Sequence, residues 1–125
     1  TRMTTKKLFS RNVEASKMPG ESEDDFQSWI IDLAHTTGWL VAHFRPALTK
    51  KGWRTAVSAD GAGFPDLLLT RDQVTIYAET KSKTGKVSPE QRIWLEALAQ
   101  NPGNRCYIWR PEDRPEIEEA LKRGK

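Results

Sequence analysis

The central segment of the chain is GAGFPDLLLTRDQVTIYAETKSKTGK, residues 61–86. It contains two short apolar runs, Leu67–Thr70 and Val74–Ala78, joined by the polar turn Arg71–Gln73. Apolar runs of this length separated by a few polar residues are typical of a β-hairpin. We therefore expect two antiparallel strands here, with charged residues at the open end of the hairpin: Asp66 before the first run, and Glu79 and Lys81 after the second.

The charged end of this hairpin indicates a catalytic site. Side chains alternate along a strand, so Glu79 and Lys81 project from one face roughly 7 Å apart, and strand pairing brings Asp66 beside Glu79. Two carboxylates in a low-dielectric site are costly unless a cation compensates them, and their hard oxygen atoms suit magnesium or manganese. Lys81 would then orient a water molecule or stabilise charge on a phosphate. The pattern predicts metal-assisted hydrolysis of a phosphodiester bond.

A simpler interpretation of the same residues stays open at this point. Aspartate after proline is common in turns, and a Glu-x-Lys pair on an exposed strand is often only a solvated ion pair. The motif with its loose spacing arises by chance in roughly several per cent of chains of this length. The rest of the chain has to decide between the two interpretations.

The composition is that of one globular domain, which we place at residues 21–125. The chain of 125 residues is 37% hydrophobic and 30% charged, enough for a single modest core. No apolar run approaches the roughly 20 residues of a transmembrane helix, and no signal peptide is visible. The single cysteine, Cys106, cannot form an internal disulfide. We expect a cytoplasmic protein without a zinc cluster, a membrane partner or a small-molecule organic cofactor.

Charge is segregated along the chain although the net charge is only +3. Residues 1–20 carry five basic residues and one acid, whereas residues 21–38 carry five acids and no lysine or arginine. Such segregation suggests a polyanionic partner on one side of the molecule and a cation site on the other. Solvated faces of both signs are the alternative. Residues 1–20 lack periodicity, so we expect a flexible basic arm that either contacts nucleic acid or is a disordered leader.

The remaining elements follow from caps and periodicity. Ser22 caps a helix that ends at Gly38 and buries a stripe beginning with Phe26 and Trp29. A strand at residues 39–44 follows, and His43 within it is expected to be satisfied or on the surface. Ser88-Pro89 starts a second helix that ends near residue 101. A fourth strand at residues 105–109 and a short last helix complete the order α-β-β-β-α-β-α, a mixed sheet flanked by helices.

Two segments between these elements are rich in basic residues. Residues 45–63 form a loop too long for a passive connector, and Trp53 among its basic residues suits phosphates together with a stacking surface. An ordinary loop with a packed tryptophan is nearly as good an account. The segment after Lys81 adds further lysines near the proposed site. The residues predicted to bind DNA are Arg45, Lys50, Lys51, Trp53, Arg54, Lys83 and Lys86.

Several motifs occur in an order that resembles a known family. They are Ser22-Glu23…Phe26-Gln27, Gly38-Trp39, Gly63-Phe64-Pro65-Asp66, Glu79-Thr80-Lys81 and Ser88-Pro89-Glu90-Gln91…Trp94. Over about residues 22–110 they look like the VRR-NUC family of the PD-(D/E)xK nuclease superfamily. The resemblance implies an α/β fold with a restriction-endonuclease-like core.

The resemblance also implies roles for five residues and a backbone group. Asp66, Glu79 and the carbonyl of Thr80 would bind Mg²⁺ or Mn²⁺, and Lys81 would orient or activate the attacking water. Glu23 matches the first-helix glutamate of the family, as a second metal ligand or an orienting group, although helix-dipole complementarity alone would also explain an acid there. Gln91 would support Lys81 or a phosphate, besides completing a capping box.

Standalone domains of this family are similar to junction-resolving enzymes that act as homodimers. We therefore expect a metal-dependent, structure-selective DNA endonuclease that cuts branched DNA such as Holliday junctions as a homodimer. Two alternatives remain open. One is an exonuclease or linear-duplex nuclease of the same superfamily, and the other is a non-catalytic nucleic-acid-binding module.

Overall fold

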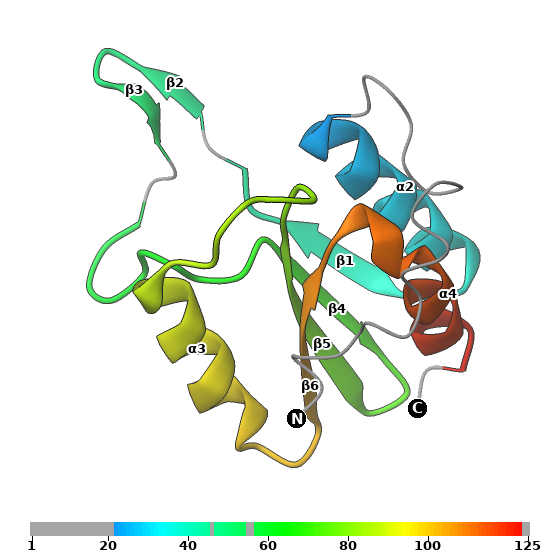
Figure 1. Ribbon diagram of the computed structural model, residues 1–125. Coiled ribbons are helices and arrows are strands. Elements are labelled where there is room, and N and C mark those ends of the chain that lie inside the picture. Colours follow the sequence, from blue (N-terminus) through cyan, green and yellow to red (C-terminus); the bar gives the residue numbers. More distant parts are fainter. Residues whose placement is uncertain (1–21, 46, 55–56, 124–125) are drawn as a thin grey trace.

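The computed structural model describes residues 22–45, 47–54 and 57–123. The expected basic arm, residues 1–20, lies outside the described residues. In Figure 1 the elements are α2 (Glu23–Thr36), β1 (Leu40–His43), β2 (Ala47–Thr49), β3 (Gly52–Arg54), β4 (Leu67–Arg71), β5 (Val74–Thr80), α3 (Pro89–Ala99), β6 (Asn104–Trp109), the 3₁₀ turn η2 (Pro111–Asp113) and α4 (Arg114–Arg123). No helix in the described part of the chain is long and apolar enough to cross a membrane.

The centre of the fold is a four-stranded mixed sheet in the order β1-β4-β5-β6. The pairs β1–β4 and β4–β5 are antiparallel, and β5–β6 is parallel. Helices α2 and α4 lie on one side of this sheet and α3 on the other (Figure 1). The predicted α-β-β-β-α-β order with a C-terminal helix is confirmed for the main sheet, and the arrangement is consistent with a restriction-endonuclease-like core.

The hairpin predicted from the central stretch is β4–β5. Its register runs from Leu67 opposite Ala78 to Arg71 opposite Val74. The two linking residues both have positive φ, 50° at Asp72 and 69° at the next residue, as in the type I′ turns that match strand twist. Extending the register by one pair sets Asp66 opposite Glu79. The turn therefore decides which carboxylates meet at the open end.

The first helix has the predicted Ser22 cap and packs its apolar stripe on the sheet. The hydroxyl of Ser22 accepts a hydrogen bond from the backbone N–H of Asp25, whose carboxylate accepts one from the backbone N–H of Ser22 in return. Phe26 and Ile30 are fully buried in a core shared with α4 and with the apolar residues of β4 and β5. Burying side chains of this size stabilises by about 1.5–3 kcal/mol each. This packing sets the distance of α2 from the end of β5.

The opposite side of the sheet is organised by aromatic rings and by the start of α3. Phe64 makes edge-to-face contacts with Phe44, Tyr77 and Trp94 at centroid distances of 5.0–6.1 Å. Gly63 has φ of 89°, and a Cβ there would lie 2.7 Å from atoms of Glu90, so only glycine lets the segment before Asp66 lie against α3. These contacts hold the first strand of the hairpin beside the helix that carries Gln91.

Part of the predicted 45–63 loop is a second hairpin, which the sequence pattern did not indicate. Strands β2 and β3 pair antiparallel as a separate two-stranded sheet, with Leu48 opposite Trp53. Gly52 takes φ of 104° at the turn, which glycine adopts at little cost. Runs of three residues are too short for periodicity to reveal them. Smaller differences lie at the strand ends: β1 begins at Leu40 rather than Trp39, because Trp39 turns into the core.

Candidate active site

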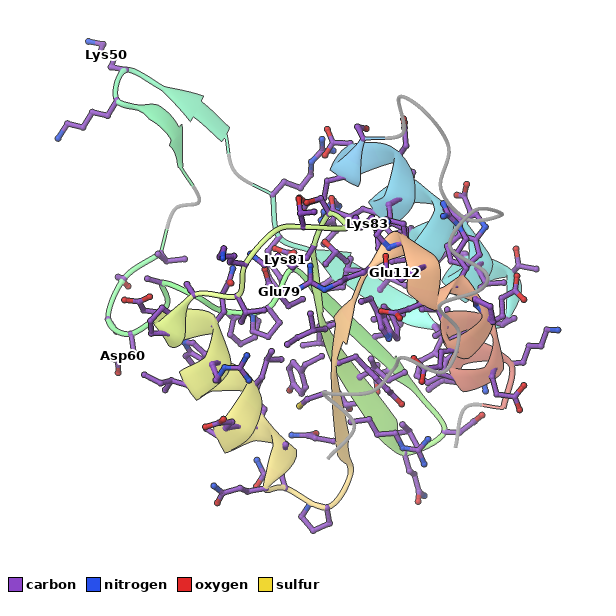
Figure 2. The ribbon with its side chains drawn as sticks, viewed as in Figure 1. Lys50, Asp60, Glu79, Lys81, Lys83 and Glu112 are labelled. Atoms are coloured by element: carbon purple, nitrogen blue, oxygen red, sulfur yellow. The ribbon has the colours of Figure 1, made fainter. Side chains whose placement is uncertain are left out.

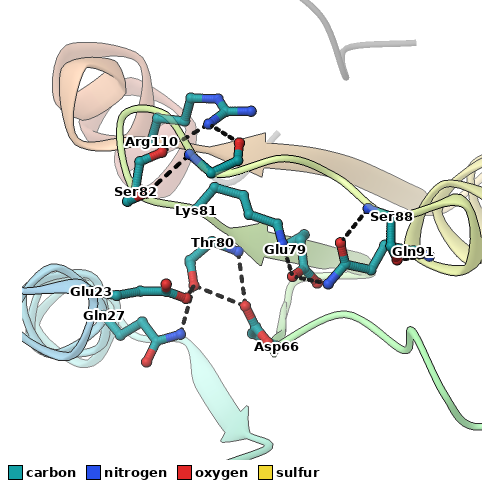
Figure 3. A network of polar contacts seen from close by, with 11 residues as sticks. Glu23, Gln27, Asp66, Glu79, Thr80, Lys81, Ser82, Ser88, Gln91 and Arg110 are labelled. Carbon is teal, nitrogen blue, oxygen red and sulfur yellow. Dashed lines mark hydrogen bonds and ion pairs between the residues drawn. The ribbon is translucent and has the colours of Figure 1, made fainter.

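The charged residues of the β4–β5 hairpin meet at its open end, at one wall of a cleft of about 460 Å³. Elements on both sides of the sheet contribute to this cleft (Figure 3). Its lining residues include Glu23 and Gln27 of α2, His43 and Arg45 at the end of β1, Asp66, Glu79 and Lys81 of the hairpin, and Gln91 of α3. The structure therefore brings together five of the six predicted catalytic and metal-binding residues as cleft walls, and the sixth, Thr80, lies between two of them in sequence.

Glu79 is a buried carboxylate with only part of its hydrogen-bonding capacity used. It is 2% exposed, and its Oε2 accepts a hydrogen bond from Gln91 Nε2 at 2.7 Å. Lys81 Nζ lies 3.7 Å from the same oxygen. The other oxygen, Oε1, is buried and has no hydrogen-bond partner among the described residues. Burial and the charge of Asp66 raise the pKa of Glu79 to about 8.

Thr80 links the first helix to Asp66. Its backbone N–H and its hydroxyl donate to Asp66 Oδ2 at 3.0 and 2.9 Å. Its hydroxyl oxygen also accepts a hydrogen bond from Gln27 Nε2 at 2.6 Å. A hydroxyl carries one proton and two lone pairs, so the Gln27 amide directs that proton toward the carboxylates. The hydrogen bonds from Gln27 of α2 to Thr80, and from Thr80 to Asp66, therefore orient the Asp66 carboxylate.

Glu23 also faces this group of residues. Its Oε2 lies 3.4 Å from the Thr80 hydroxyl, as a second acceptor for the same proton. Burial, and then the charge of Asp66, raise the pKa of Glu23. The reciprocal cap of α2 is made by Ser22 and Asp25, so Glu23 is not needed for it. A favourable interaction with the helix dipole remains part of its role.

The donor set at the open end of the hairpin fits a hard divalent cation. The described residues contain no group of three or more His, Cys, Asp or Glu side chains placed to hold a metal. A cation here would rest on Asp66 and Glu79 together with backbone carbonyl and water oxygens, which is the coordination that Mg²⁺ commonly accepts. The buried Glu79 Oε1 without a partner is the observation in favour, because such an acceptor is costly unless something binds it.

The predicted DNA-binding residues fall into two groups. Arg45 lines the cleft, and Lys83 and Lys86 are exposed in the segment that follows Lys81. Lys50 and Lys51 are exposed at the tip of the β2–β3 hairpin, which projects away from the body (Figure 2). The side chains of Trp53 and Arg54 lie outside the part of the chain that the structure describes, so their role in DNA binding stays a prediction.

The backbone of the segment that carries Lys83 is hydrogen-bonded to the side chain of Arg110. The Arg110 guanidinium donates to the backbone carbonyls of Ser82 and Gly85, both at 2.8 Å. Arg110 itself is positioned by Asp113, whose carboxylate accepts its backbone N–H at 2.9 Å. Multiple bonds from one guanidinium restrict the path of the backbone. The lysine-bearing segment is therefore anchored at the exit of β5.

Four residues that line the cleft were not predicted to have a role in the site: Asp24, Gln27, His43 and Phe44. Gln27 is 6% exposed and reaches Thr80; its position four residues after Glu23 puts both on one helix face, which could have revealed it. His43 was expected to be satisfied or on the surface; it is partly exposed and lines the cleft. Burial, and then the charge of Arg45, lower its pKa. Its pairing with Leu67, the neighbour of Asp66, depends on a strand register that the sequence does not show.

A comparison with protein families shows the family of the chain. The model described as the VRR-NUC domain matches residues 14–110. The chain belongs to the VRR-NUC domain family. The match includes every residue of the cleft, from Glu23 to Gln91, and confirms the resemblance seen in the sequence. This is a nuclease-type family, so DNA is the substrate class of the domain. A comparison with curated protein sequences gave no match.

Proposed function

We propose that this VRR-NUC domain is a divalent-metal-dependent endonuclease that hydrolyses phosphodiester bonds in branched DNA, such as Holliday junctions, as a homodimer. The observation that carries the catalytic part is the buried Glu79 carboxylate, with one oxygen unpartnered and the other held by Gln91 and Lys81. A buried carboxylate beside a second, partly buried one is unfavourable on its own. A cation and a phosphate substrate together would compensate it.

The roles of the residues follow from their contacts. Asp66, Glu79 and the carbonyl of Thr80 would hold Mg²⁺ or Mn²⁺, with Glu23 as a further ligand or as the group that orients Thr80. The ion supplies Lewis-acid stabilisation of the charge that develops on the phosphate. Lys81 is placed beside Glu79 to orient the attacking water and to stabilise negative charge. Gln91 keeps the Glu79 carboxylate in one orientation, which is the usual task of such supporting groups.

Binding of the substrate would rest on its backbone. Arg45 lines the cleft, and Lys83 and Lys86 are exposed in the segment after Lys81, so these three residues would contact backbone phosphates of the substrate. Phosphate contacts position the protein but carry no base sequence. We therefore propose recognition by shape rather than by base readout. A dimer would place two active sites on one substrate, as symmetrical nicking of a four-way junction requires.

A cleavage assay on four substrates tests the proposal. Labelled four-way junction, flap, fork and linear duplex are incubated with Mg²⁺, Mn²⁺ or EDTA, using the wild type, Lys81→Ala and the control Lys122→Ala. Lys122 is exposed on α4 and does not line the cleft. Paired symmetrical nicks in the junction, lost in EDTA and in Lys81→Ala but kept in Lys122→Ala, are the expected result.

The other outcomes separate the alternatives. Cleavage of flap or linear duplex but not of the junction would keep the active site and reject the junction assignment. Tight binding of DNA without any metal-dependent cleavage would reject the enzyme in favour of a binding module. Sedimentation of the protein with and without a junction measures the dimer directly.

A further inference from the structure

The β2–β3 hairpin stands apart from the rest of the described structure. It forms its own two-stranded sheet and shares no strand pairing with the main sheet. In Figure 1 it projects from the region where β1 ends, well beyond the body of the domain. A two-stranded hairpin gains little stability by itself. A projecting hairpin of this kind therefore suggests a partner that it contacts.

The charge of this hairpin identifies the kind of partner. Residues 45–59 contain four basic residues and no acid. Lys50 and Lys51 occupy the turn between the strands and are exposed, and Figure 2 shows Lys50 at the far end of the hairpin, directed away from Lys81 and Glu79. Arg45 lies at the base of the same segment and lines the cleft. Positive charge is thus present both beside the active site and at a distance from it.

The chain length between these two points sets the reach of the hairpin. Lys50 is the fifth residue after Arg45, and an extended chain of five residues spans at most about 18 Å. The major groove of B-DNA is about 12 Å wide, and 18 Å corresponds to about five base-pair steps along one strand. While one phosphate occupies the cleft, the hairpin tip can therefore contact a second phosphate. This second phosphate lies either on the other side of a groove or on an adjoining arm of the substrate.

From this geometry we infer that the β2–β3 hairpin is an arm that binds duplex DNA remote from the cut, through phosphate contacts of Lys50 and Lys51. The inference rests on the proposed function for the position of the cut phosphate in the cleft. It adds a requirement to the substrate: duplex DNA must extend past the cleavage point far enough for the hairpin tip to reach it.

The salt dependence of binding measures these contacts one by one. Each phosphate that is neutralised contributes about −0.9 to the slope of log K against log salt. Binding of a junction is measured in EDTA, so that no cleavage occurs, for the wild type and for Lys50→Ala, Lys51→Ala and the double variant. We expect the slope to become less steep by about 0.9 for each single variant and about 1.8 for the double variant. Lys122→Ala is the matched control and should keep the wild-type slope.

A series of substrates with shorter arms tests the reach. Wild-type affinity should rise as the duplex flanking the cleavage point is extended past about five base pairs, and the double variant should lose that rise. An unchanged salt slope in the double variant, with wild-type thermal stability, would overturn the inference. Slopes that change while arm length has no effect would overturn the assignment to remote duplex.

These measurements are independent of the proposed catalytic activity. If the wild type cleaves junctions but the lysine variants keep its salt slope and its dependence on arm length, only the hairpin inference fails. If nothing is cleaved but the slope and the dependence on arm length change as expected, only the proposed catalysis fails. The charge-reversed variant Lys50→Glu/Lys51→Glu should weaken binding further than the alanine pair, because it repels the phosphates it approaches.

Discussion

Two glutamines contact the candidate active site from opposite sides of the sheet, and they differ in what fixes their own orientation. Gln27 of α2 donates its amide to Thr80 at 2.6 Å, and Gln91 of α3 donates its amide to Glu79 at 2.7 Å. The residues that they contact are neighbours in β5. A side-chain amide thus orients a carboxylate on each side of the site. Gln91 contacts the Glu79 carboxylate directly, and Gln27 acts on Asp66 through the Thr80 hydroxyl.

The difference lies in the second contact of each glutamine. The side-chain oxygen of Gln91 accepts the backbone N–H of Ser88 at 2.9 Å, so the start of its own helix sets its orientation. Gln27 depends on the packing of α2 against the sheet, where its neighbour Phe26 is fully buried. The orientation of Gln91 is therefore set by neighbouring residues in the sequence. The orientation of Gln27 depends on the packing of two segments that are distant in the sequence.

The largest expected effect comes from Gln91. Gln91→Leu removes both contacts, whereas Gln91→Glu keeps an acceptor for Ser88 and loses the donor to Glu79. We expect both variants to lose about 10- to 100-fold in metal affinity or cleavage rate, as is typical for a group that supports a metal ligand. Gln91→Leu should also lose about 1 kcal/mol of stability, because it lacks the cap. Gln91→Glu keeps the cap but sets a second carboxylate against Glu79, so any loss of stability in that variant should come from this repulsion. Cleavage titrated with Mg²⁺ and thermal unfolding measure the two effects.

The two Gln91 variants also test the proposed difference between Gln91 and Gln27. Full activity in Gln91→Glu would mean that the donated hydrogen bond to Glu79 does not matter for the site. A wild-type melting temperature in Gln91→Leu would mean that the capping contact is not what holds this side chain.

Gln27 should have a smaller effect on activity and a larger one on stability. Gln27→Leu leaves the buried hydroxyl of Thr80 without its donor, which costs about 1–3 kcal/mol. Cleavage should fall less than tenfold, because the backbone N–H and the hydroxyl of Thr80 still hold Asp66. In a double-mutant cycle with Thr80→Val we expect a coupling of about 0.5–3 kcal/mol in unfolding free energy.

A second cycle sharpens this result. Gln27 and Gln91 share no hydrogen-bond partner, so Gln27→Leu and Gln91→Leu should be additive within about 0.5 kcal/mol in unfolding free energy. A strong coupling between them would show that the two sides of the site are not independent.

The third and smallest effect is a pH dependence of stability without metal. The pKa of Glu79 is raised in the folded protein to about 8, above the ordinary value of 4.5 that we expect in the unfolded chain. The folded state therefore binds more protons between these values, and its stability should fall as pH rises from about 5 to 8. Thermal unfolding in EDTA across this range measures the slope.

The variant Glu79→Gln tests whether Glu79 causes the slope of stability against pH. Glu79→Gln should flatten it and leave only the smaller contribution of Glu23, whose pKa is raised in the same direction. An unchanged slope in Glu79→Gln would place the titrating group elsewhere. Added Mg²⁺ should raise the melting temperature most at the high end of the range, because the ionised carboxylate is the form that binds a cation.

Features that depend on near neighbours in the chain could be predicted from the sequence. The β4–β5 hairpin, the Ser22 and Ser88 caps and the glycine before the Asp66 strand each rest on a few adjacent residues. The meeting of Asp66 with Glu79 belongs here too, since a two-residue turn sets the register of a hairpin. These local rules were enough to indicate the charged end of the hairpin and the helix that supplies Gln91.

Features that depend on packing were missed or left open. The task of Gln27 requires α2 to lie over the end of β5, and the place of His43 in the cleft requires the register of β1 on β4. For both residues the deciding contact joins segments far apart in the chain. The β2–β3 hairpin is local, and it was missed because strands of three residues carry no usable periodicity.

The charged hairpin, the capped helices and the family of the chain all follow from the sequence. The burial of Glu79, with one oxygen that has no hydrogen-bond partner among the described residues, follows only from the folded structure. The same holds for the hydrogen bonds that run from Gln27 through Thr80 to Asp66. The two kinds of feature differ because hydrogen bonding in a turn or cap is set by adjacent backbone. Burial and desolvation depend instead on which distant side chains exclude water from the same place.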